Sequence, residues 1–125
     1  MAAVERLRGA TGNGWDDRAF ALARETGYAR GEALALIELA HSRLDSGARS
    51  DALTAAREAL DSARQAGYRL IEAEALTVLA RVELADGQPR DAVAHASEAL
   101  DIQQQTGNPL GVRRAEEVLG RAAAS

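Results

Sequence analysis

Residues 27–66 read GYARGEALALIELAHSRLDSGARSDALTAAREALDSARQA, and residues 67–106 repeat the pattern as GYRLIEAEALTVLARVELADGQPRDAVAHASEALDIQQQT. Without a gap, the two segments are identical at 18 of 40 positions, which include Gly27/Gly67 and Leu36/Leu76. A third copy begins at Gly107 and breaks off at the end of the printed sequence. A fixed period of roughly 20 to 50 residues, filled with helix formers, is typical of stacked helical hairpins. The repeat therefore predicts an all-α fold.

Each copy divides into two helices. The first has apolar residues at steps of three and four and ends at a glycine, Gly47 or Gly87. The second opens near Ser50 or at Pro89 and carries a face of alanines, which lets two helix axes approach closely. We expect antiparallel hairpins wound into a right-handed superhelix of about six helices.

The same pattern predicts the organisation of the chain. We expect a flexible segment at 1–14, a partial repeat at 15–27, full repeats at 28–67 and 68–107, and a half repeat at 108–125. Asn108 and Pro109 are a helix start signal for the half repeat. Its helix is expected to end where Arg121 opens a run of alanines. Tyr28 and Tyr68, before the first helix of each copy, are interpreted as contacts between repeats.

Composition excludes several classes of function. The chain has no cysteine, which removes disulfides and thiolate metal sites, and its net charge of −4 gives no general attraction to nucleic acid or anionic membranes. The glycines at 9, 12 and 14 lack the strand and the Lys-Ser/Thr of a phosphate-binding loop. The absence of a signal peptide or a long apolar run favours a cytoplasmic protein.

The recurring residues resemble the tetratricopeptide repeat family, whose pattern has Leu-Gly in its first helix, glycine at the turn and alanines in its second. The matching positions are Leu36, Leu39, Ala40, Gly47, Ala52, Ala56 and Ala59, then Leu76, Leu79, Ala80, Gly87, Ala92, Ala96 and Ala99. The period of 40 exceeds the usual 34. It is similar to the long repeats of bacterial signalling and transcriptional regulators and of some eukaryotic scaffold proteins.

This resemblance implies a concave face lined by the first helix of each hairpin. Transfer of the family's binding positions gives four rows of candidate partner-binding residues. These are His41, Arg81 and Arg121; Ile37, Thr77 and Glu117; Leu34, Glu74 and Arg114; and Leu44 and Leu84. The rows predict a basic spine beside an apolar strip, suited to a peptide with acidic and aliphatic side chains. The alternative interpretation is that these are solvated surface residues and that the partner binds elsewhere.

Catalysis and cofactors are not expected. Glu38 and His41 have the Glu-x-x-His spacing of di-iron bundles, but a second copy of this motif is missing, which favours an ordinary polar pair. His95 is expected to be a half-exposed helix residue. We therefore expect a non-catalytic module for protein or peptide binding, as part of a bacterial regulator. The alternative is a homodimer formed through uncapped ends, because Val112, Val118 and Leu119 lack a following helix to cover them.

Overall fold

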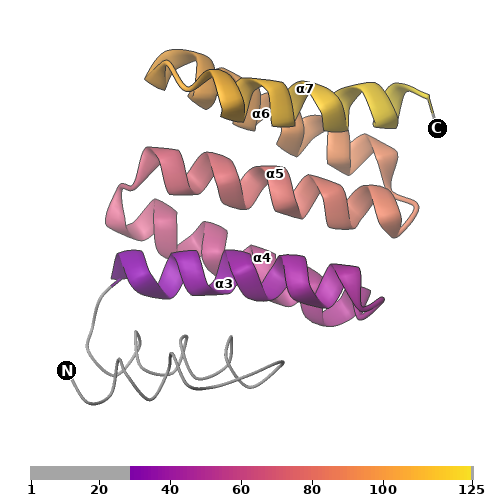
Figure 1. Ribbon diagram of the computed structural model, residues 1–125, viewed down its shortest axis with the longest axis horizontal. Helices are drawn as coiled ribbons and strands as arrows, with labels where there is room; N and C mark the ends of the chain where they lie inside the picture. Colours follow the sequence, from indigo (N-terminus) through magenta and orange to yellow (C-terminus); the bar gives the residue numbers. More distant parts are fainter. Residues whose placement is uncertain (1–28, 125) are drawn as a thin grey trace.

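The structure, a computed structural model, describes residues 29–124, which form five α-helices (Figure 1). Their bounds are α3 (Ala29–Asp45), α4 (Arg49–Ala66), α5 (Arg69–Ala85), α6 (Pro89–Thr106) and α7 (Pro109–Ala123). The all-α fold predicted from the repeat is confirmed. The predicted flexible segment at 1–14, the partial repeat at 15–27 and Tyr28 lie outside the described residues.

Glycine ends the helices where the period places it. At the end of α4, Gly67 has a φ of 75°, which side-chain-bearing residues rarely adopt. Its N–H bonds to the carbonyl of Arg64, and the N–H of Tyr68 bonds to the carbonyl of Ala63 at 3.0 Å. This is the Schellman arrangement, which satisfies the last carbonyls of the helix and reverses the chain direction. The chain is thereby turned back to begin the next helix.

The helix starts follow the predicted signals, with small differences. Pro89 and Pro109 occupy first-turn positions of α6 and α7, where the missing N–H costs no hydrogen bond. The Asn108 side chain caps α7 by accepting from the N–H of Gly111. α4 begins one residue before the predicted Ser50 and has no side-chain cap.

The end predicted for the last helix was wrong, because α7 continues to Ala123 instead of dissolving at Arg121. Glu117 and Arg121 form an ion pair one turn apart, and Ala122 is buried. Val118 is also buried, so the neighbouring helices already cover it. Local pairing and packing therefore extend the helix through the alanine run.

The helices form two layers. α3, α5 and α7 run side by side in one layer, and α4 and α6 lie in the second, behind them in Figure 1. The backbone of α5 lies close to those of both α3 and α7, whereas the backbones of α4 and α6 do not approach each other. Because the three-helix layer is the more closely spaced, we call α3, α5 and α7 the inner layer, and α4 and α6 the outer layer.

The core consists of alanines and leucines contributed by both layers. Leu36 and Leu76 are 2% and 0% exposed, which confirms the predicted buried face of the first helices. On α4 the buried residues include Ala52, Ala56 and Ala59. These small side chains allow α4 to lie close against α3 and α5.

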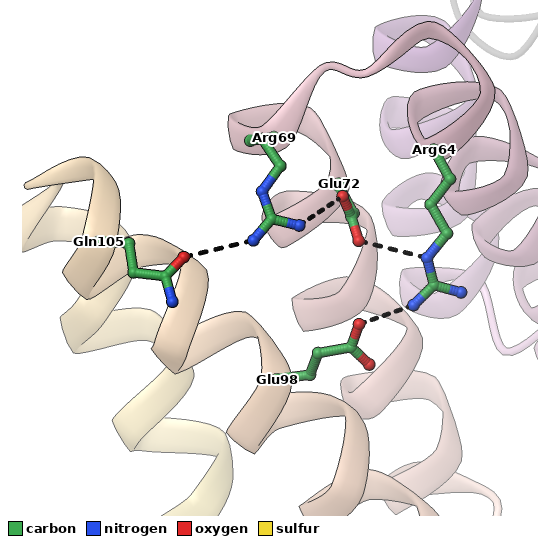
Figure 2. A network of polar contacts seen from close by, with 5 residues as sticks. All are labelled: Arg64, Arg69, Glu72, Glu98 and Gln105. Atoms are coloured by element: carbon green, nitrogen blue, oxygen red, sulfur yellow. Dashed lines mark hydrogen bonds and ion pairs between the residues drawn. The ribbon is translucent and has the colours of Figure 1, made fainter.

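A polar network ties α4, α5 and α6 together (Figure 2). Glu72 on α5 is 6% exposed and accepts from Arg64 of α4 and from Arg69, each at 3.2 Å. Arg64 also reaches Glu98 of α6 at 2.7 Å, and Arg69 donates to Gln105 of α6 at 3.3 Å. One nearly buried carboxylate thus links successive hairpins, because its two arginine partners extend to the neighbouring helices.

Candidate functional site

A cavity of about 580 Å³ opens between the three helices of the inner layer. We call it the three-helix cavity. From α3 it is lined by Ile37, Glu38 and His41, and from α5 by Glu74, Thr77, Val78 and Arg81. α7 contributes Leu110, Gly111, Arg114, Glu117, Val118 and Arg121. Gln103 of α6 and Asn108, which precedes α7, complete the lining.

The 40-residue period explains why the lining residues meet. Residues 40 apart occupy the same face of parallel neighbouring helices, so His41, Arg81 and Arg121 form one row across the cavity. Ile37, Thr77 and Glu117 form a second row. The repeat in the sequence therefore places equivalent residues of α3, α5 and α7 next to one another along the cavity wall.

Eight of the eleven predicted partner-binding residues line the three-helix cavity, and three leucines do not. Leu34 packs against the larger core cluster and Leu84 against the smaller one. Leu44, also half-buried, lies near the end of α3 and outside the lining. The predicted apolar strip therefore does not line the cavity, because Leu34 and Leu84 pack against the core and Leu44 lies outside the lining. Ile37, Val78, Leu110 and Val118 supply the apolar lining instead.

His41 and Arg81 form a hydrogen-bonded pair in the cavity, with 2.9 Å between His41 Nδ1 and an Arg81 guanidinium nitrogen. Burial, and then the nearby Arg81 and Arg114, lower the pKa of His41, while Glu38 and Asp45 act in the opposite direction. The imidazole is thus neutral at pH 7, and its Nδ1 accepts from the guanidinium. His41 therefore positions Arg81 instead of adding a positive charge.

The charge of the lining is mixed. Its guanidinium groups are Arg81, Arg114 and Arg121, and its carboxylates are Glu38, Glu74 and Glu117. Glu117 and Arg121 pair with each other at 3.3 Å. The row predicted as a basic spine is therefore interrupted by a neutral histidine and flanked by glutamates. Within residues 29–124, Arg114 forms no ion pair.

Gln103 is a lining residue that the sequence reasoning missed. Its side chain is 1% exposed and lies flat against Gly111, where an added Cβ atom would come within 2.3 Å of Gln103 Cδ. Forty residues earlier the corresponding positions hold Ala63 and Ile71. The small Ala63 is thus replaced by the large Gln103, and the large Ile71 is replaced by Gly111. The paired departure from the repeat is a sequence signal that points to this contact.

The two histidines have separate side-chain partners. His41 bonds to Arg81, and His95 Nδ1 lies 2.6 Å from the buried carboxylate of Glu83. His95 is half-exposed on α6, as predicted. In the part of the chain that the structure describes, no group of three or more His, Asp or Glu side chains is arranged to hold a metal ion.

Comparison with known proteins adds no further constraint. No protein-family model matches the chain, and no curated protein matches it. Among the helices of residues 29–124, none has both the length and the apolar character needed to cross a membrane.

Proposed function

We propose that this chain is a non-catalytic interaction module that binds a protein segment or peptide in the three-helix cavity. The observation that carries the proposal is the cavity itself, to which α3, α5 and α7 each contribute charged and aliphatic side chains. Its volume of about 580 Å³ lies within the roughly 300–1,000 Å³ of ordinary ligand sites. The resemblance to tetratricopeptide repeats supports the same function and favours a bacterial regulator as its setting.

The lining favours a peptide that carries both acidic and aliphatic residues. Arg114 has no ion-pair partner within the described residues, and Arg81 is held in place by a neutral histidine. Leu110 is 53% exposed and lines the cavity together with the apolar side chains of Ile37 and Val78. A guanidinium binds carboxylates through charge-assisted hydrogen bonds, and the exposed leucine gains by covering its apolar surface.

The alternative of a homodimer through uncapped ends is less well supported by the outer residues of α7. Three positions of the first helix in each copy are apolar and buried: Ala33, Leu36 and Ala40 in α3, and Ala73, Leu76 and Ala80 in α5. The equivalent positions of α7 hold Arg113, Glu116 and Gly120. All three are exposed. This face thus offers two charged side chains and a glycine where stacking of a further helix on the same plan needs apolar side chains. Light scattering at micromolar concentration tests the alternative, which a concentration-dependent dimer would favour.

The proposed function is tested with an array of blocked decapeptides in which acidic, basic, aliphatic and polar residues are varied. We expect the purified chain to retain peptides that combine acidic and leucine-like residues, and fluorescence anisotropy then measures their affinity. The double variant Arg81→Glu/Arg121→Glu should weaken binding by roughly tenfold or more, because each charge-assisted hydrogen bond contributes about 1.5–3 kcal/mol. Helicity and melting temperature should change little.

A matched control has the same change in net charge outside the cavity. Arg57 on α4 and Arg90 on α6 are both exposed and absent from the lining, so Arg57→Glu/Arg90→Glu should retain binding. Equal loss in both double variants would indicate a general charge effect. Failure of the whole array to bind, or full binding by the Arg81/Arg121 variant, would refute the proposed function.

A further inference from the structure

We infer that the side-chain amide of Gln103, fixed by Asn108 and admitted by Gly111, is a hydrogen-bond donor that binds a peptide carboxylate in the three-helix cavity. This inference rests on the proposed peptide-binding function. It adds a specificity-determining residue from the outer layer to a site otherwise built from α3, α5 and α7.

A relay of hydrogen bonds fixes the orientation of the amide. The N–H of Gly111 donates to Asn108 Oδ1 at 3.4 Å, which leaves the Asn108 amide nitrogen as a donor. That nitrogen donates to Gln103 Oε1 at 3.1 Å. Because Gln103 Oε1 is the acceptor in this bond, its Nε2 group is left as the donor for a ligand.

The free donor borders the cavity. Gln103 Nε2 has no hydrogen-bond partner among residues 29–124. In the same region, every side-chain nitrogen or oxygen that is fully buried has a partner, so Nε2 must reach open space. Gln103 is 1% exposed and lines the three-helix cavity, which is therefore the space that the donor meets. An unused donor on a nearly buried side chain is a group to which a ligand acceptor can bind without displacing a protein contact.

The start of α7 makes the same place favourable for negative charge. α3 and α5 each carry a glutamate in the first turn, Glu32 and Glu72, whereas α7 has Val112 at that position and no first-turn acid. The partial positive charge at this helix start is therefore not balanced by a carboxylate of its own first turn. Arg114 lies one turn beyond Gly111 and also lines the cavity.

The ligand group favoured by these features is a side-chain carboxylate. It would accept from Gln103 Nε2 and form an ion pair with Arg114, which lacks one in the described chain. Of the glutamates in the lining, Glu117 is paired with Arg121, and Glu38 and Glu74 make no hydrogen bond to Gln103. None of them occupies the donor.

The test uses two blocked pentapeptides, one with a glutamate between leucines and one with glutamine in its place. We expect the glutamate peptide to bind the unmodified chain roughly tenfold or more tightly. In NMR spectra of ¹⁵N-labelled protein, the side-chain amide signals of Gln103 should shift when the glutamate peptide is added and should change little when the glutamine peptide is added. This readout needs no variant, so it does not depend on how a substitution folds.

The variant Gln103→Glu keeps an acceptor for Asn108 but replaces the donor with a carboxylate oxygen, and it should lose the preference for glutamate. Gln104→Glu is the matched control, because it adds the same charge to the adjacent, exposed position outside the lining. Retained preference in Gln103→Glu, or unmoved Gln103 signals while the glutamate peptide binds, would overturn the inference and leave the proposed function standing. Absence of binding by either peptide, together with an empty decapeptide array, would refute both.

Discussion

Gly111→Ala should destabilise the protein, although alanine is the better helix former. The added Cβ atom would lie 2.3 Å from Gln103 Cδ and 2.5 Å from both terminal atoms of that amide, so the nearly buried glutamine must move. Forcing a side chain out of a packed position costs roughly 1–3 kcal/mol, and losing its bond to Asn108 costs about 1 kcal/mol more. The helix propensity of alanine offsets up to about 1 kcal/mol. The net loss of stability is about 1–3 kcal/mol.

Urea denaturation followed by circular dichroism measures this loss, and two variants make the interpretation specific. Gly120→Ala, in the same helix but with no atom within 4 Å of the added Cβ, should stabilise by roughly 0.5–1 kcal/mol. In a Gln103→Ala background the clash is absent, so Gly111→Ala should also become mildly stabilising. The coupling between positions 103 and 111 is then roughly 1.5–4 kcal/mol. The reasoning is refuted if Gly111→Ala is as stabilising as Gly120→Ala.

Three further predictions concern stability. Leu79→Ala removes a side chain that is 2% exposed and should cost about 2–5 kcal/mol in urea denaturation; an unchanged midpoint would contradict the assigned core face. The pKa of His41 is lowered in the folded state from its ordinary value of 6.5. At a pH below this value the unfolded chain therefore binds more protons at His41 than the folded chain does. Stability should therefore fall as the pH drops below that value, and His41→Gln should lose this component in melts between pH 5 and 8. Glu72→Gln should cost about 1–2 kcal/mol, since the Glu72 carboxylate is nearly buried but its arginine partners are half-exposed. Glu98→Gln, in which Glu98 and its partner Arg64 are each 45% exposed, should cost under about 0.5 kcal/mol. Equal losses of stability in the two variants would contradict a central role for Glu72.

Much of the inner layer could be predicted because it follows from local periodicity. Leu36 and Leu76 are spaced to share a helix face with the other apolar residues, and a positive-φ glycine such as Gly67 marks a helix end. The candidate rows came from the resemblance to tetratricopeptide repeats, and the period of 40 explains why Arg81 lies beside His41. The degree to which each side chain is buried was less predictable. Leu34 and Leu84 face the core because the packing of neighbouring helices determines which part of a helix surface remains open.

The contacts around α6 could not be obtained from the repeat. Gln103 and Gly111 depart from the pattern, and a sequence comparison shows each departure without showing that the two residues touch. The same holds for Glu72, whose partners Arg64 and Arg69 both precede it in the chain and extend to a third helix. Such contacts depend on how far one helix is rotated and shifted along its axis relative to the next helix. The residue pattern within one helix contains no information about this rotation and shift.

The sequence by itself determined the helices, the glycine-marked ends and the apolar faces that are buried, because backbone propensity, capping and helical spacing act within about one turn of each residue. Only the tertiary structure decided which side chains surround the three-helix cavity, that His41 is a neutral partner of Arg81, and that the Gln103 amide presents its donor there. The physical reason is distance along the chain. His41 and Arg81 are 40 residues apart, and the hydrogen bond between them exists only after whole helices have packed against each other.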